Sequence, residues 1–264
     1  MIMYSWKLWI SGPLFLTCPL GRNIYLFLIF GLVCIASAQT NLTPVLGDYA
    51  YPIYLNASGY HTNYPDTNDH ADLDMLVQRL VELGANNYFY LIEISNYDWD
   101  DLQAFLPKAK IAGIKVWVYV VAPSEQPPLA MGNLYSQPYR TDYITWAKEI
   151  AKLSIRYPNL VGYVIDDFWE NVRENTLLTP TYINKMVTAG KVINPNLKFY
   201  PLTYSNEVFN PYTMNISTLF DGMVVAFAED SLKIAKNISL MNSSLHSKVV
   251  MSILPITTDR KSVV

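Results

Sequence analysis

Two adjacent carboxylates, Asp166 and Asp167, follow an apolar stretch at residues 160–165, and Trp169 and Glu170 come directly after them. Carboxyl groups at the end of a buried strand can act as general acid, general base or nucleophile. Cleavage of a glycosidic bond needs a pair of carboxyl groups, and the aromatic rings flanking these acids also suit a sugar. The segment therefore indicates carbohydrate chemistry, with Asp167 and Glu170 as the first-choice catalytic acids.

Two other interpretations of the acidic pair stay open. Side chains alternate along a strand, so Asp166 and Asp167 face the same side only if the strand has ended before them. If it has not, one of them is structural and accepts hydrogen bonds from loop amides. The pair could also ligate a divalent cation through oxygen. We expect neither a metal nor another cofactor, because the three histidines lack metal-ligand spacing and no nucleotide fingerprint is present.

The segments around the acidic pair alternate in type. Short β-branched or aromatic stretches are followed by longer stretches of helical period, which is the βαβα pattern of a parallel sheet or barrel. Strands are expected at residues 51–55, 88–94, 115–121, 160–165, 198–204, 221–227 and 248–254. Helices are expected at residues 72–84, 98–112, 139–157, 180–194 and 231–245.

This pattern predicts an α/β fold, namely a (β/α)8 TIM-barrel-like domain at residues 45–255 that lacks the eighth strand and helix. A complete barrel typically takes about 250 residues. Residues 256–264 carry no apolar periodicity, and we interpret them as a short tail or the end of a truncated product. A missing strand would leave two unpaired sheet edges.

In such a barrel the catalytic residues lie at the carboxyl ends of the strands. The acids expected there as partners of the first-choice pair are Asp166, Glu229 and Glu93. The side chains expected to bind substrate are Trp169, Tyr54, Tyr119, Tyr204 and Asn96. The competing interpretation places most of the aromatic residues in the core, because large rings bury much apolar surface.

Residues 1–38 differ in character from the rest of the chain. Lys7 and Arg22 precede an apolar run at residues 24–35, which leads into an A-x-A cleavage site at residues 36–38. We interpret this segment as a secretory signal peptide. The run is shorter than the ~20 residues that a membrane-spanning helix needs, and an uncleaved signal anchor is the alternative. Cleavage would remove both cysteines of the chain.

Five sequons of the form N-x-S/T occur, at Asn41, Asn56, Asn215, Asn237 and Asn242. In a eukaryotic cell these asparagines are candidate glycosylation sites. Their number agrees with a secreted, extracellular glycoprotein.

The composition bounds the class of partner. The chain is 51% hydrophobic and 16% charged, which suits a globular domain with a sizeable core. It has 19 Lys and Arg against 22 Asp and Glu, with no basic run, so a nucleic-acid partner is not expected. The expected partner is a carbohydrate or glycan substrate, and membrane contact would occur only through an uncleaved signal anchor.

The segment at residues 162–171, GYVIDDFWEN, resembles secreted (β/α)-barrel glycoside hydrolases whose fourth strand ends in I-D-D-F. A more distant likeness is to the strand-four signature of family 18 chitinases, D-G-x-D-x-D-x-E. In that alignment Glu170 takes the place of the catalytic acid and Asp166 that of the outer Asp. Phe168 stands where the middle Asp belongs, and Tyr163 replaces the first one.

These observations predict a secreted glycoside-hydrolase-like protein that acts on O-glycosidic bonds by carboxylate acid/base catalysis. The alternative is a noncatalytic carbohydrate-binding or degenerate barrel protein, which would keep an aromatic cleft without a working acid pair. The missing eighth strand favours this alternative. The separation of the carboxyl groups decides between them.

Overall fold

The computed structural model of the 264-residue chain describes residues 47–48, 54–55, 61–62, 69–93, 95–126, 136–172, 177–204, 208, 215–227 and 248–253. All of these belong to the segment Val45–Val264. The predicted signal peptide, the helix expected at residues 231–245 and the tail at residues 256–264 lie outside the described residues. None of the described helices is long and apolar enough to cross a membrane.

Seven parallel strands form the main sheet. They are β1 (Gly47–Asp48), β5 (Asn87–Ile92), β6 (Lys115–Val120), β7 (Leu160–Ile165), β8 (Lys198–Tyr204), β9 (Gly222–Phe227) and β10 (Lys248–Ile253). They pair in chain order, β1-β5-β6-β7-β8-β9-β10, and every pair is parallel. Within the described part of the chain, β1 and β10 are the edges of the sheet and the barrel is not closed.

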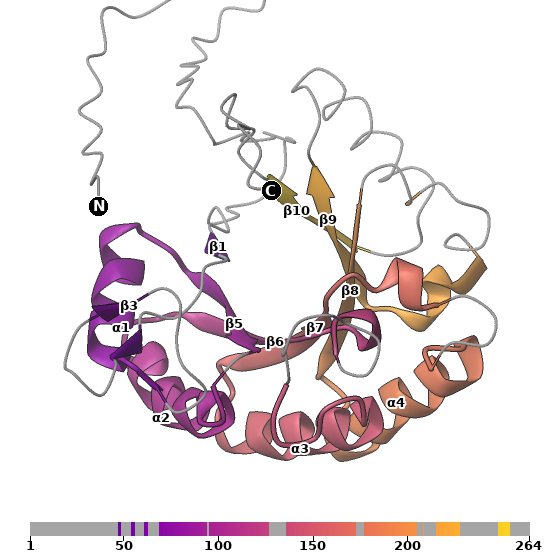
Figure 1. The fold of residues 1–264 in the computed structure, drawn as a ribbon, viewed down its shortest axis with the longest axis horizontal. Helices are drawn as coiled ribbons and strands as arrows, with labels where there is room; N and C mark the ends of the chain where they lie inside the picture. The colour runs from indigo at the N-terminus through magenta and orange to yellow at the C-terminus, as the bar shows by residue number, and fades with distance from the viewer. Residues whose placement is uncertain are drawn as a thin grey trace, which may run out of the picture. The chain divides into compact units, whose positions relative to one another are not determined.

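The helices lie on the outer, convex side of the curved sheet (Figure 1). They are α1 (Leu73–Glu82), α2 (Asp98–Ile111), α3 (Tyr143–Arg156) and α4 (Pro180–Ile193). Side chains cap three of them, since Asp72, Asp142 and Thr179 accept hydrogen bonds from backbone amides three residues ahead. This arrangement of strands and helices confirms an incomplete (β/α)8 barrel.

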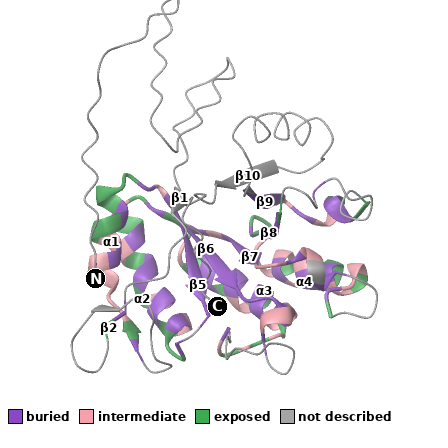
Figure 2. Cartoon of the chain, turned by 45° about the horizontal axis from the view of Figure 1, so that its top comes forward, coloured by how far each residue is buried: buried purple, intermediate pink, exposed green. Residues whose placement is uncertain are grey.

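Strands β5, β6 and β7 are buried on both faces of the sheet (Figure 2). One apolar cluster fills the space between the sheet and the helices, and a second one covers the inner face. On the inner face, Trp117 packs between Phe89 and Tyr200, with ring centroids 5.7 and 4.7 Å away. Gly162 lies below the Trp117 ring, and a Cβ there would come within 2.5 Å of it. The missing side chain of Gly162 therefore makes room for the indole ring.

The prediction for the first barrel strand is wrong. Residues 51–55 were expected to form it, but Gly47–Asp48 is the strand that pairs with β5. Tyr54–Leu55 (β2) instead pairs antiparallel with His61–Thr62 (β3) and His70–Ala71 (β4). Hydrogen bonds to helix α2 hold this small sheet in place. Local β propensity does not show which partner a strand takes.

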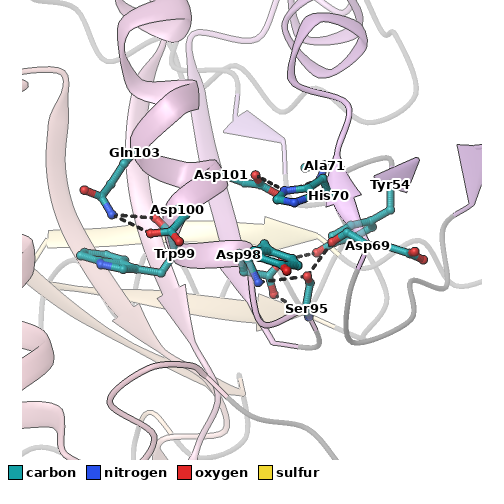
Figure 3. Close-up of polar contacts among 11 residues, drawn as sticks. Tyr54, Asp69, His70, Ala71, Ser95, Asp98, Trp99, Asp100, Asp101 and Gln103 are labelled. Atoms are coloured by element: carbon teal, nitrogen blue, oxygen red, sulfur yellow. Dashed lines mark hydrogen bonds and ion pairs between the residues drawn. The ribbon is translucent and has the colours of Figure 1, made fainter. Parts of the chain in front are cut away.

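Figure 3 shows the contacts between the small sheet and the first turn of α2. The buried carboxylate of Asp98 accepts a hydrogen bond of 2.7 Å from the hydroxyl of Tyr54. The carboxylate of Asp101 accepts one of 2.8 Å from the amide of Ala71 and lies 2.9 Å from Nδ1 of His70. The His70 ring stacks on Tyr97, with centroids 4.0 Å apart. The small sheet is therefore fixed to α2 through two carboxylates.

Candidate active site

Strand β7 ends at Ile165, directly before the acidic pair. Asp166 continues the alternation that places Val164 in the inner-face cluster. By the same alternation Asp167 would point outwards, but its φ of +36° is left-handed and turns it back. Its Oδ1 accepts a hydrogen bond of 2.8 Å from the hydroxyl of Tyr204, which continues the inner face of β8. Both carboxylates therefore lie at the carboxyl end of the inner face.

The side chain of Phe168 lies on the outer side of the sheet, in the apolar cluster beneath the helices. Its ring is buried and packs against Phe199 and Phe220, with centroids 5.6 and 5.5 Å away. Its amide donates to the carbonyl oxygen of Leu202 at 3.2 Å. This anchored ring holds the left-handed turn at Asp167 in place.

Asp166 lies in a partly buried, polar environment. Burial, together with the charge of Asp167, raises the pKa of its carboxyl group to about 6. Hydrogen bonds from the Tyr119 hydroxyl and from the Asp167 amide act in the opposite direction. The amide bond to Oδ1 of Asp166 is 2.8 Å long. Asp166 therefore titrates close to neutral pH.

A third carboxylate, Glu125, joins this group and was not predicted from the sequence. It ends a short 3-10 helix, η1 (Pro123–Glu125), which follows β6. Burial, together with the charges of Asp166, Asp167 and Glu93, raises the pKa of Glu125 to about 8. At neutral pH the Glu125 carboxyl group is protonated and can donate a proton.

Glu93 lies just beyond the end of β5 and is buried. Its amide donates to the second carboxylate oxygen of Asp98 at 2.9 Å. Its position continues the alternation of Phe89 and Leu91 on the inner face. Acids from the ends of β5, β6 and β7 thus gather at one end of the sheet, as expected for a barrel active site.

The other predicted site residues occupy different surroundings. Tyr119 is buried on the inner face beside Asp166, whereas Tyr204 is 38% exposed beside Asp167. Trp169 is half-buried and packs against the outer core. Asn96 is exposed in the turn that leads into α2.

Tyr54, also predicted to bind substrate, is buried and belongs to the small sheet, where it bonds to Asp98. Its expected place at the end of the first barrel strand was wrong, because that strand is Gly47–Asp48. Glu170 lies in a second 3-10 helix, η2 (Trp169–Asn171), with its side chain outside the described part of the chain. Glu229 and the sequons at Asn41, Asn56, Asn237 and Asn242 also lie outside the described residues. Asn215 is described, and it is exposed.

A sequence signal for Glu125 exists. It lies five residues after the end of β6, the same interval that separates Glu170 from the end of β7. Examining every acid within about five residues of each expected strand end would have included it. Among the residues with described side chains, no three His, Cys, Asp or Glu are placed to hold a metal ion together.

No protein family profile matches the sequence, and no curated protein sequence matches it. Solved structures of glycoside hydrolases do match the fold. A calcium-binding mutant of Bacteroides uniformis β-glucuronidase 2 is similar over 78% of this chain and 24% of its own, with a TM-score of 0.50 at 11% identity.

Two smaller glycoside hydrolases match over more of their own length. A GH53 catalytic domain from Ignisphaera aggregans matches over 76% of this chain and 62% of its own, with a TM-score of 0.47 at 13% identity. A GH113 β-1,4-mannanase matches over 68% of this chain and 65% of its own, with a TM-score of 0.45 at 11% identity. The chain thus spans a little under two thirds of these two structures. At these identities the likeness shows the fold alone.

Proposed function

We propose that this protein hydrolyses O-glycosidic bonds by carboxylate acid/base catalysis, with Glu125 as the proton donor and Asp167 as its carboxylate partner. The observation that carries the proposal is the raised pKa of Glu125, about 8, among carboxylates from two neighbouring strand ends. Carboxyl groups whose surroundings differ in this way take different roles in acid/base catalysis.

The chemistry requires one protonated and one ionised carboxyl group on either side of the scissile bond. Glu125 gives its proton to the departing glycosidic oxygen as the bond to the anomeric carbon breaks. In one route the carboxylate of Asp167 attacks the anomeric carbon as that bond breaks, and water deprotonated by the ionised Glu125 then displaces Asp167 from the sugar. In the other route Asp167 removes a proton from the water that attacks the anomeric carbon directly. Tyr204 orients Asp167 through its hydrogen bond of 2.8 Å.

Asp166 supports the pair. It accepts hydrogen bonds from Tyr119 and from the Asp167 amide, so it fixes the turn that presents Asp167. Its charge also helps to keep Glu125 protonated. The charge of Glu93, at the end of β5, also helps to keep Glu125 protonated.

The distant likeness to family 18 chitinases makes Glu170 the acid instead. Glu170 stays a first-choice catalytic residue on that ground, with Glu229 as a further partner. The two assignments are separated by comparing Glu125→Gln with Glu170→Gln in the same assay.

The test uses a panel of aryl glycosides whose leaving groups differ in basicity. If Glu125 is the acid, Glu125→Gln should lower kcat/KM by about 10²- to 10⁴-fold for poor leaving groups. The loss should be much smaller for dinitrophenyl glycosides, which depart without protonation. Glu149→Gln is the control, because Glu149 pairs with Lys152 on helix α3 and should leave turnover unchanged.

A uniform loss across all leaving groups would remove Glu125 from the role of acid. Oligosaccharide binding by the unmodified protein without any product would instead leave a noncatalytic carbohydrate-binding barrel. The anomer formed first, observed by NMR, would show whether Asp167 acts as nucleophile or base.

We also propose that the protein follows the secretory route and carries N-linked glycans. The apolar run at residues 24–35, the cleavage site after Ala38 and the five sequons support this. Asn215 is exposed, so a glycosyltransferase can reach it. Mass spectrometry of the protein expressed in a eukaryotic host would detect the glycan on Asn215 and a new N-terminus at Gln39. An intact N-terminus would favour the signal anchor.

A further inference from the structure

The 3-10 helices η1 and η2 follow neighbouring strands, and one buried side chain joins them. Nδ2 of Asn171, in η2, donates a hydrogen bond of 2.9 Å to Oγ of Ser124 in η1. Oδ1 of Asn171 accepts one of 2.9 Å from the Ser124 amide. The side chain of Asn171 therefore bonds to both the backbone and the side chain of the residue next to Glu125.

The side-chain amide of Asn171 also contacts Asp167, the second residue of the proposed catalytic pair. Nδ2 of Asn171 donates a second hydrogen bond of 2.9 Å, to the carbonyl oxygen of Asp167. Asp167 is thus held from two sides, at its carbonyl by Asn171 and at its carboxylate by Tyr204. These contacts stabilise the left-handed φ of Asp167, which aspartate adopts more readily than most residues but less readily than glycine.

We propose that Asn171 is a positioning residue that holds Glu125 and Asp167 at their working separation by tying η1 to η2. The catalytic consequence rests on the proposed glycosidase function, but the positioning does not. Asn171 is 4% exposed, so it touches no substrate and acts through its neighbours alone.

The electrostatics of Glu125 follow from this tie. The groups whose charges face it are Asp166 and Asp167 from β7 and Glu93 from β5. The phenols of Tyr143 and Tyr204 also lie within its field. If the tie is cut, η1 can move away from these acids and Glu125 gains contact with water. Both changes lower the pKa of Glu125 towards its ordinary value of 4.5.

The experiment measures the pKa of Glu125 directly, by NMR titration of its 13C-labelled carboxyl group in the full chain. The signal is assigned by its loss in Glu125→Gln. We expect Asn171→Ala to lower this pKa by about one unit or more. With a substrate in hand, the high-pH limb of kcat/KM should move down by the same amount, and kcat should fall more than KM rises.

Asn159→Ala is the matched control. Nδ2 of Asn159 likewise donates two hydrogen bonds, in this case to the backbone carbonyls of Leu106 and Ile114 at the amino end of the sheet. Its loss should lower the melting temperature in a similar way and leave the pKa of Glu125 unchanged.

Ser124→Ala and Ser124→Thr test the tie more gently. Ser124→Ala removes only the hydroxyl group that accepts a hydrogen bond from Asn171. It should lower the pKa of Glu125 by less than Asn171→Ala does. Ser124→Thr keeps the hydroxyl and should restore the wild-type value. This pair also decides the matter if Asn171→Ala does not fold.

The two proposals fail in different ways. An unshifted pKa of Glu125 in Asn171→Ala, or an equal shift in Asn159→Ala, would overturn the positioning role whatever the activity. A shifted pKa in a protein that turns over no glycoside would retain the positioning role and refute the glycosidase.

Discussion

The hydroxyl of Tyr204 lies 2.8 Å from Oδ1 of Asp167 and joins the ends of strands β8 and β7. The bond depends on the left-handed φ of Asp167, which turns its carboxylate to the inner face of the sheet. Burial and the nearby Asp167 carboxylate raise the pKa of Tyr204, so the phenol keeps its proton and donates across the physiological range. The pair thus presents a fixed carboxylate at the end of the barrel.

Tyr204→Phe removes this hydrogen bond and leaves the ring in place. Hydrogen bonds to charged groups contribute roughly 1.5–3 kcal/mol, and Tyr204 is partly exposed, so the lower end applies. We expect kcat to fall about tenfold in a glycosidase assay, with the melting temperature changed by less than about 4 °C. An unchanged kcat would show that Asp167 does not need this partner.

The pH dependence of kcat/KM should be bell-shaped. With Glu125 as the acid, activity falls as the pH rises through about 8, where Glu125 loses its proton. It should also fall as the pH drops through about 6, where Asp166 becomes protonated and no longer supports the turn at Asp167 with its charge. Initial rates measured from about pH 4 to about pH 10 would record both limbs of the profile. A profile that stays flat through pH 8 would remove Glu125 as the acid.

Glu125 should make the protein less stable as the pH rises, whereas an ordinary ion-paired acid makes a protein more stable as the pH rises. Its pKa is about 8 in the folded protein and 4.5 when exposed, so between these values the folded state binds more protons than the unfolded state. The free energy of unfolding therefore decreases as the pH rises from about 4.5 to about 8. Glu125→Gln removes this contribution.

The variant and the wild type should be equally stable near pH 4, and the variant should be more stable near pH 8. Solvent reduces the effect at this partly exposed site, so we expect a gain of about 2–4 °C in melting temperature at pH 8. Thermal unfolding at the two pH values measures it. A variant that loses stability at pH 8 would mean that Glu125 has a stabilising partner in its ionised form.

Most of the sheet could be predicted because its strands are buried on both faces. The run at residues 160–165 became β7 with the same bounds, and 198–204 became β8. Helix ends also followed local chemistry, since Thr179 caps α4 and Gly113, with a φ of +74°, lies just beyond α2. Apolar strand patterns and helix caps depend on residues close together in the chain, so they can be recognised from the sequence alone.

The first strand, the role of Glu125 and the backbone conformation of Asp167 could not be predicted, for a different reason. Gly47–Asp48 is too short to show a period, and only its pairing with β5 makes it a strand. Glu125 is distinguished by charges from the ends of β5 and β7, which no local pattern encodes. The left-handed turn at Asp167 likewise depends on Asn171, Tyr204 and the buried ring of Phe168.

Gly162→Ala tests the packing beneath the site. The new Cβ would lie 2.5 Å from the carbonyl oxygen of Lys198 and 2.5 Å from the Trp117 ring. The indole is held by Phe89 and Tyr200, and a backbone carbonyl cannot rotate away, so strain is unavoidable. We expect a loss of about 2–3 kcal/mol in denaturant unfolding.

Gly113→Ala is the control for that substitution. Its φ of +74° makes alanine unfavourable by about 1 kcal/mol, but nothing lies within 4 Å of the added Cβ. Equal losses at the two positions would mean that the inner face relaxes around Trp117 and is not tightly packed.

Asp98→Asn tests the buried network that fixes the small sheet to α2. Asp98 is fully buried and accepts hydrogen bonds from the Tyr54 hydroxyl and from the amides of Glu93 and Ser95. An asparagine keeps one acceptor oxygen for the two amides but places its NH2 group opposite the Tyr54 hydroxyl, so the charge-assisted hydrogen bond from that hydroxyl is lost. We expect a loss of about 2–4 kcal/mol in urea unfolding.

Asp100→Asn is matched to it, because Asp100 lies in the same first turn of α2 and is exposed. Both variants lose the favourable interaction of a negative charge with the helix N-terminus, and only Asp98→Asn loses the network. The control should therefore cost less than about 1 kcal/mol. Because the Glu93 amide bonds to Asp98, Asp98→Asn should also shift the titration of Glu125, while Asp100→Asn should leave it unchanged. Equal losses in the two variants would assign the stabilisation to the helix terminus and not to the network.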